Sequence, residues 1–461
     1  MLIKEDQFDF LKKYLLCLIK PLYGYPLFIS INLIAQDSKV KSVPINSSKA
    51  SFGLNSEFSY LMMEPNQNLR KLKLLIKSKS EGKIADKSLT IGFSMIGLMD
   101  YQKSNTNSKF GYLMRHPTSN NQIGESVSEA VIHSSQISLT ASLNNWITAY
   151  GELLYDPQQS FGAGSITALG RNQIQLRKGI LVLGNLNKLP LYLSIGKMDI
   201  PFGQTGSVSP FTNSTMWHAY GVLSYGAILG FEKAGLNANI ALIQGGAQFR
   251  AAHTPVQGTN IPSRLNNFSA DLNYTFEPID RVQIQLGGSY LKGTAYCQGF
   301  PVTHFAPCEE SNSAFSYYGN ITINDRLYIK ASFATTQDIW PGTHNPNAPL
   351  DVFEAVKVSS LDYGAIYQIN PNDNIIYSLS AEFSNFVSGA EGSPWERSNQ
   401  IIVGLNAQIE STSRFFVELL NTKGYSPLNF ISGGNFPDLG ITHSVSDATS
   451  TGIVVGVLFT I

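Results

Sequence analysis

The residue types that most often carry out chemistry, histidine and cysteine, form no catalytic or metal-binding pattern in this chain. The seven histidines include no His-Glu-x-x-His motif and no pair four residues apart. An enzyme would also need a nucleophile and a base that act together, and no spacing in the sequence singles out such a pair. We therefore expect no enzyme activity, no bound metal and no cofactor.

Two cysteines bracket a loop rich in proline and glycine. Cys297 and Cys308 enclose ten residues between two strand-like runs. A pair at this spacing in an exported chain is typical of a disulfide. His304 lies between them and would add a third ligand for zinc, but three ligands without a second cluster are a weak zinc signal. We predict a disulfide between Cys297 and Cys308, with zinc as the alternative.

The composition excludes several classes of protein. The chain has 461 residues, 33 basic and 33 acidic side chains, and only 14% charged residues, whereas soluble domains carry about 25%. Zero net charge argues against a nucleic-acid partner, and the 21 tyrosines and 26 phenylalanines argue against disorder. No apolar run after residue 40 is long enough for a membrane helix, which needs about 18 residues.

The N-terminal stretch resembles a secretory signal. Lys4, Lys12 and Lys13 precede an apolar stretch that ends near Ala35, as in the basic and apolar regions of a signal peptide. We expect residues 1–35 to be a cleaved signal. The alternatives are a membrane anchor, or a start residue placed ahead of a shorter signal.

Apolar and polar residues alternate strictly from residue 88 onward, which indicates half-buried strands. The run 268–290 forms one hairpin around a turn at 277–280, and similar units cover 315–333 and 361–383. Seven short turns separate long connections, and together with an opening and a final strand they give sixteen strands. An even count with alternating short and long connections is typical of a transmembrane barrel.

Alternation alone does not distinguish a membrane barrel from a soluble sandwich. The outer faces are too poor in lysine and glutamate for contact with water, and aromatic residues gather at strand ends, as in the girdles of outer-membrane proteins. We predict that residues 88–461 form an all-β, 16-stranded antiparallel transmembrane β-barrel in the outer membrane of a Gram-negative bacterium. A barrel of this size leaves an aqueous channel.

Charged residues on the polar face of the strands are the candidates for lining this pore. Their signs are mixed, so no strong anion or cation filter is indicated, and the alternative is that they only keep the wall wet. These residues are Lys178, Glu232, Asp271, Lys330, Glu382, Arg414 and Glu418.

The sequence Ile-Gly-Lys-Met-Asp-Ile-Pro-Phe-Gly-Gln at 195–204 ends one strand and opens a long connection. Glycine allows close backbone approach and proline stops a strand ladder. The segment either enters the lumen and constricts the pore or bends at the rim. The constriction candidates are Lys197, Asp199, Pro201, Phe202 and Gly203. The other long loops, at 99–130, 336–357 and 423–449, suit substrate capture or surface display.

Residues 36–87 precede the barrel and are rich in lysine. They are too few for the plug domain that fills 22-stranded receptors, so we expect a short, solvated N-terminal periplasmic extension. Contact with anionic lipid heads or the cell wall is the alternative. Its basic residues are Arg70, Lys71, Lys73, Lys77, Lys79, Lys83 and Lys87.

Three segments carry a resemblance to a known family. The Gly-Lys-x-x-x-Pro-Phe-Gly segment at 196–203, the hairpin at 146–155 and the Glu-Pro-Asn-Gln-Asn-Leu-Arg-Lys-Leu run at 64–72 resemble the LbtU family of siderophore porins. The resemblance implies a sixteen-stranded barrel with a periplasmic extension that takes up iron-siderophore complexes without an energised plug domain.

The sequence therefore predicts an outer-membrane porin for small molecules, and the resemblance implies ferri-siderophore as the substrate. A general or sugar-type diffusion porin is one alternative, and an adhesin or surface-binding barrel that works through its loops is another. The membrane is a partner in each case, and a homo-oligomer is left open.

Overall fold

The computed structural model describes residues 50–63, 71–105, 125–155, 174–244, 265–297, 311–345, 348–372, 375–410, 412–424 and 447–461. Within these residues, no helix is long and apolar enough to cross a membrane. The expected signal at 1–35 lies outside the described residues.

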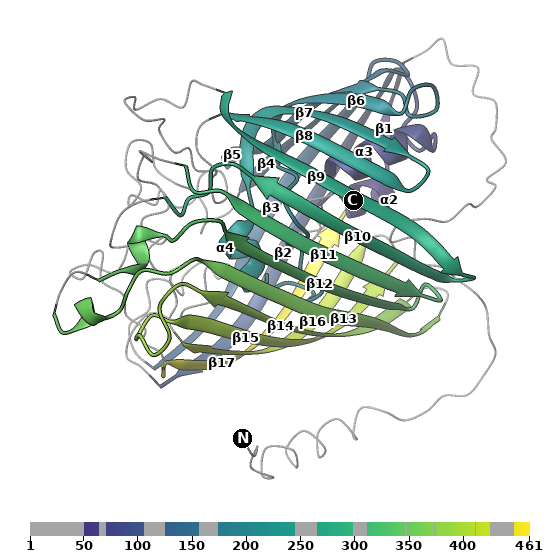
Figure 1. Cartoon of the computed structure of the whole chain (residues 1–461). Helices are drawn as coiled ribbons and strands as arrows, with labels where there is room; N and C mark the ends of the chain where they lie inside the picture. The colour runs from purple at the N-terminus through teal and green to yellow at the C-terminus, as the bar shows by residue number, and fades with distance from the viewer. Residues whose placement is uncertain are drawn as a thin grey trace. The chain divides into compact units, whose positions relative to one another are not determined.

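Sixteen antiparallel strands form one closed barrel (Figure 1). The last strand returns to the first, and Ser450 pairs with Ser104 while Thr460 pairs with Ser94. The predicted fold class is confirmed. The strands are β2 (Ser88–Ser104), β3 (Ser126–Ser142), β4 (Ile147–Tyr155), β5 (Ile174–Gly184), β6 (Leu191–Asp199), β7 (Leu223–Lys233), β8 (Leu236–Gln244), β9 (Leu265–Ile279), β10 (Val282–Leu291), β11 (Ala314–Ile323), β12 (Leu327–Thr336), β13 (Ser359–Asn372), β14 (Ile375–Val387), β15 (Arg397–Ile409), β16 (Ser413–Gly424) and β17 (Thr449–Thr460).

Short turns join the strands in pairs at one end of the barrel. Several turn residues have a positive φ, which tight turns between antiparallel strands require: Ala234, Arg281, Asn324, Asp325 and Glu410. β9 continues through Ile279 and β10 begins at Val282, so the turn predicted at 277–280 lies at 280–281 in the structure.

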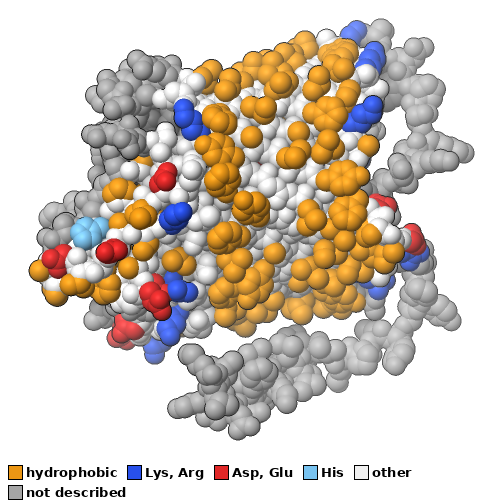
Figure 2. All heavy atoms as spheres, viewed as in Figure 1, with side chains coloured by type: hydrophobic (Ala, Val, Ile, Leu, Met, Phe, Trp, Pro, Cys, Tyr) orange, Lys and Arg blue, Asp and Glu red, His pale blue; other side chains and the backbone are white. Residues whose placement is uncertain are grey.

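The outer face of the barrel is apolar. Leu272, Leu286 and Tyr317 are each more than half exposed, and on the face seen in Figure 2 charged side chains gather toward the two ends while hydrophobic ones cover the strands between. A closed barrel leaves no unpaired strand edge in lipid, and its exterior satisfies the apolar band that a membrane demands.

A seventeenth strand, β1 (Ser51–Leu54), pairs in parallel with the start of β2. It was not predicted. The ladder between β17 and β2 ends where Ile461 N donates to Phe93 O at 2.9 Å, so β2 would have an open edge before that point. β1 covers this edge, and an unpaired edge is a known liability for association.

Two short helices follow β1, and both pack on the inside of the barrel: α2 (Ser56–Met63) and α3 (Lys71–Ser80). α2 contacts β2, β3 and β17, whereas α3 contacts β5 and β6. Gly92 of β2 allows the approach of α2, because a Cβ there would lie 2.5 Å from Ser59 Oγ. Ser138 of β3, on the inner face, donates to Met63 Sδ at 3.4 Å.

The expectation of a solvated extension is therefore wrong for part of these N-terminal helices. Lys71 is 1% exposed and Met62 and Met63 are fully buried, while Lys83 and Lys87 are exposed as expected. The segment is smaller than a plug domain, yet it occupies the inner wall of the barrel near the short turns.

The inner wall over β4 to β8 carries buried apolar side chains among polar ones such as Glu152 and Asn239, and the apolar ones form a hydrophobic core with Leu75 and Ile76 of α3. This part of the lumen is filled with side chains. The inward-facing members from the wall are Tyr150, Ile180, Val182, Tyr192, Met198, Ile228, Ala241 and Ile243.

Candidate functional site

Residues 200–222, the connection between β6 and β7, lie inside the barrel; we call them the lumen segment. Ile200 N donates to Val222 O at 3.0 Å, which closes the base of the segment. Residues 208–220 between these ends are all buried. The segment contains the helix α4 (Thr215–Tyr220) and contacts the opposite wall.

Gly203 fixes the first turn of the lumen segment. Its φ is +65°, which favours glycine, and a Cβ there would lie 2.5 Å from Ser316 Oγ of β11. Gly203 N donates to Ser289 Oγ of β10 at 2.9 Å. The predicted Pro-Phe-Gly bend therefore turns the chain against the far wall of the lumen.

Carboxylates of the far wall bind the backbone of the lumen segment. Glu418 of β16 accepts from Phe211 N at 2.5 Å and from Thr212 N at 3.0 Å. Glu382 of β14 accepts from Val208 N at 2.7 Å. These hydrogen bonds fix the backbone of the segment at two points, so Glu382 and Glu418 act as clamps on the segment.

Two basic residues of the same wall bind carbonyls of the segment. Arg414 Nη2 donates to Pro210 O at 2.9 Å, and Lys330 Nζ donates to Gly206 O. Lys330 also pairs with Asp362 at 2.5 Å and lies 3.7 Å from Glu382. Four of the seven predicted pore-lining residues therefore hold the lumen segment in place.

α4 is anchored at both ends. Ser214 caps its N-terminus by accepting from Trp217 N at 3.2 Å, and Tyr220 OH donates to Val358 O at 2.7 Å. Burial raises the pKa of the Tyr220 hydroxyl well above its ordinary value, so this hydroxyl remains a donor at all physiological pH values.

A second buried charge group joins the N-terminal helices to the wall. Lys71 Nζ lies 2.6 Å from Glu152 Oε2 of β4, and both side chains are almost fully buried. Tyr150 OH donates to the same carboxylate at 2.9 Å. The predicted Lys178 pairs nearby with Asp199 at 2.5 Å. Lys71 and Glu152 were not proposed as site residues, because no sequence pattern relates them.

The remaining predicted pore residues are held by polar neighbours on the wall. Asp271 accepts from Ser289 Oγ at 2.6 Å and from Tyr318 OH at 2.7 Å. Glu232 accepts from Asn237 Nδ2 at 3.1 Å. Among the residues that the structure describes, both carboxylates bind side chains of the wall strands and none of the lumen segment.

The constriction candidates separate into two groups. Pro201 O accepts from Ser269 Oγ at 3.0 Å, and the centre of the Phe202 ring lies 5.8 Å from that of Tyr220. Pro201, Phe202 and Gly203 therefore all lie in the lumen. Lys197 stays on the wall in register with Tyr225, and its Nζ donates to Leu176 O at 2.9 Å.

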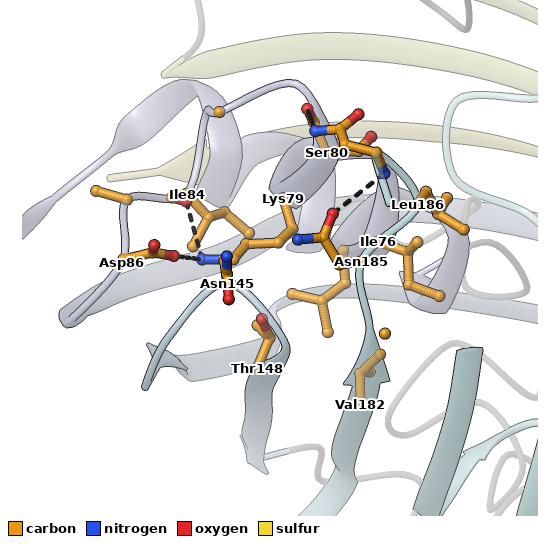
Figure 3. Close-up of a pocket in the computed structure, with 15 residues that line it drawn as sticks. Ile76, Lys79, Ser80, Ile84, Asp86, Asn145, Thr148, Val182, Asn185 and Leu186 are labelled. Atoms are coloured by element: carbon orange, nitrogen blue, oxygen red, sulfur yellow. Dashed lines mark hydrogen bonds and ion pairs between the residues drawn. The ribbon is translucent and has the colours of Figure 1, made fainter. Parts of the chain in front are cut away.

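A cavity of about 310 Å³ lies between α3 and two short turns. Lys79 Nζ bonds Asp86 (Figure 3) and also Ser142 Oγ of β3. Asn187 Nδ2 donates to Ser80 O at 2.7 Å. Apolar side chains such as Val182 line its floor. Polar bonds thus hold α3 to the two short turns, and the space between the helix and the turns is not completely filled by side chains.

Cys297 follows β10, and Cys308 lies outside the described residues. The disulfide between them stays a prediction.

No protein family model matches the chain. A protein of Coxiella burnetii (strain RSA 493 / Nine Mile phase I), named UPF0422 protein, is 31% identical over 194 residues, which cover 40% of this chain and 37% of that protein. UPF0422 protein lpl2888 of Legionella pneumophila (strain Lens) is 24% identical over 198 residues, covering 42% of this chain and 33% of that protein. The match thus spans little more than a third of the curated relatives, and the resemblance to the LbtU family is not confirmed.

Solved structures of similar fold are outer-membrane channels. An anion-selective porin from Comamonas acidovorans covers 81% of this chain and 100% of its own, with a TM-score of 0.48 and 11% identity. The outer membrane channel DcaP of Acinetobacter baumannii covers 80% and 97%, with a TM-score of 0.44 and 11% identity. At this level the similarity concerns the fold alone.

The closed barrel and its apolar exterior decide where the protein resides. Strands cross a membrane only when every backbone group is paired within a closed ring, which the pairing of β17 with β2 achieves. Barrels of this type belong to outer membranes, and the two curated relatives come from Gram-negative bacteria. The chain is an outer-membrane β-barrel of a Gram-negative bacterium.

Proposed function

We propose that the protein is a passive outer-membrane channel for small molecules whose bore is narrowed by the lumen segment and by the N-terminal helices. A barrel of sixteen strands is wide enough for an aqueous passage. The observation that carries the proposal is the clamping of the lumen segment by Glu382 and Glu418 on the opposite wall. An insert held in this way reduces the cross-section without closing the ring of strands.

The substrate is proposed from the resemblance to siderophore porins, which implies a ferri-siderophore as the cargo and movement without an energised plug domain. A general or sugar-type diffusion porin remains the competing function. Both require conduction, so conduction is the first property to test.

The purified chain in planar bilayers should conduct in small, ohmic steps with weak ion selectivity. Glu418→Gln removes the charge that binds Phe211 N and Thr212 N, and a hydrogen bond to a charged group contributes about 1.5–3 kcal/mol. The loosened segment should raise single-channel conductance.

Glu232→Gln is the matched control, because Glu232 bonds Asn237 on the wall. The single-channel conductance of this variant should stay at the wild-type value. Heat-shifted electrophoretic mobility verifies that each variant has formed a barrel. If the wild-type barrel folds but carries no current, the channel function is excluded and a surface-binding barrel is left.

A further inference from the structure

Six side-chain amides form a continuous row on the inner wall, which we call the amide track. It runs from β8 across β9, β10 and β11 and ends on the lumen segment. Its members are Asn237, Asn239, Asn273, Gln285, Asn320 and Gln204.

The direction of these side chains follows from the strand alternation. Along β8 and β9, Ile240 and Leu272 are more than half exposed on the outer face, whereas Asn239 and Asn273 are less than a tenth exposed. Successive side chains of a strand point to opposite faces. The asparagines therefore face the lumen.

Each amide of the track binds the next one. Asn239 Nδ2 donates to Asn237 Oδ1 at 2.6 Å, and Gln285 Nε2 donates to Asn273 Oδ1 at 3.0 Å. Asn320 Nδ2 donates to Gln285 Oε1 at 2.8 Å. A primary amide has two N–H donors and an oxygen with two lone pairs, so each member has bonding capacity beyond its neighbours in the row.

The track reaches the narrowed part of the lumen. Asn320 Nδ2 also donates to Gln204 Oε1 at 3.3 Å, and Gln204 Nε2 donates to Tyr328 OH at 2.6 Å. Gln204 lies on the lumen segment next to Gly203. A solute that moves along the row would therefore pass from the wall to the lumen segment.

Two carboxylates lie beside the β8 and β9 part of the track, and Lys330 is the cross-strand partner of Asn320 at its other end. Glu232 binds Asn237 and Asp271 binds Asn273 at 3.0 Å, while the track itself is uncharged. An anionic solute would meet like charge here, and rings of acidic residues repel anions in pores. A neutral solute exchanges its water for amide hydrogen bonds with no uncompensated charge.

We propose that the amide track is a binding path for uncharged solutes rich in hydroxyl and amide oxygens. This inference rests on the proposed channel function and names its substrate class. A neutral oligosaccharide and a neutral ferric trihydroxamate complex share this chemistry, whereas a trianionic ferric tricatecholate complex does not.

The test is a current-block titration of the full chain in planar bilayers with maltohexaose, a neutral ferric trihydroxamate and a trianionic ferric tricatecholate. At least one neutral probe should block the current at a concentration about tenfold below that of the tricatecholate. Block by the trihydroxamate alone identifies the neutral iron complex as the cargo, and block by maltohexaose alone identifies an oligosaccharide.

Asn273→Asp places a charge within the track, and Gln285→Glu does so at a partly exposed position where folding is less at risk. Each should weaken block by the neutral probe about tenfold, as expected when one bonded amide is lost. Asn406→Asp makes the same change on the inner face of β15, away from the track, and should leave block unchanged.

Equal block by neutral and anionic probes in a conducting wild type would overturn the substrate class while leaving the channel intact. An equal loss in Asn406→Asp and Asn273→Asp would show that the row only braces the wall. Absence of current in the wild type would instead overturn the channel function itself.

Discussion

Several charged residues of the lumen hold other segments of the chain in place. Glu382 and Glu418 bind backbone N–H groups of the lumen segment, and Glu152 binds Lys71 of α3. Strand alternation predicted that Glu382 and Glu418 face inward, but it could not predict what they bind. Their partners lie 174 and 207 residues away along the chain, and no local pattern encodes such a contact.

The predicted Lys178 shows another limit at this scale. The ladder between β4 and β5 slips by one residue, so that Glu152 pairs with Lys178 and Leu153 with Leu176. Arg177 is the additional residue of this bulge, and both Arg177 and Lys178 are buried. Strict alternation assigns only one of two neighbouring residues to the lumen. It therefore could not predict that Arg177 and Lys178 are both buried, which the bulge in the structure explains.

The ion pair between Lys71 and Glu152 should determine how firmly the N-terminal helices are seated. Lys71→Met removes the ammonium group that bonds the buried Glu152 carboxylate and leaves Lys178 as its cross-strand neighbour. Breaking a buried ion pair costs up to about 3–5 kcal/mol. We expect faster hydrogen exchange in residues 71–80 of the folded barrel, measured by mass spectrometry.

Lys83→Met is the control for this change, since Lys83 is exposed and pairs with Glu81 at 3.2 Å on the surface. Exposed pairs contribute about 0–1 kcal/mol, so exchange should not change. Equal protection in Lys71→Met and the wild type would show that apolar packing alone seats the helix.

Elements differed in how well they could be predicted. The strands follow from the period-two pattern because each one places an apolar face in lipid. α2 and α3 have only eight and ten residues, and isolated helices of that length are marginal in water. They form because they pack on the inner wall, for example at Gly92. The sequence could not predict this packing, because the many lysines of this region indicate a solvated segment.

The lumen segment should depend on the conformation of one residue. Gly203→Ala combines a positive φ with a Cβ placed 2.5 Å from Ser316 Oγ, and backbone strain of this kind costs about 1–3 kcal/mol. The first turn should shift, and single-channel conductance should change in the folded barrel.

Gly392→Ala separates strain from collision. Gly392 has a φ of +80° and open space around its Cβ position, and it lies in the loop between β14 and β15. Its conductance should match the wild type even though the strain is similar. If both variants conduct alike, Gly203 has no special part in placing the segment.

The whole molecule is a ring of strands in lipid with a partly solid interior. Its closure and its outer apolar band were predictable because the membrane imposes them on every strand. Its interior was not, because β5 is apolar on both faces where it passes α3, and a strand apolar on both faces does not show in its sequence what covers the inner one. Ile180 and Val182 on β5 face α3, while Leu181 between them faces outward.

Charge on the outer face should be penalised according to depth. Leu272→Arg places a cation midway along β9, where such a change costs about 2–4 kcal/mol. We expect a corresponding loss in the free energy of unfolding, measured by urea titration in lipid vesicles.

Ile279→Arg provides the comparison at the end of the same strand, beside the turn residue Asp280. Near the interface the same substitution costs about 0–1 kcal/mol. Equal losses for Leu272→Arg and Ile279→Arg would contradict the placement of β9 across the bilayer.

The clamping of the lumen segment also has an electrical consequence. Thermal motion of a loosely tethered insert would vary the width of the bore from moment to moment, and the current would flicker. Glu382, Arg414, Glu418 and Lys330 hold this insert from three different strands, β12, β14 and β16. An open channel of this protein should therefore give a quiet trace, with current noise close to the thermal limit.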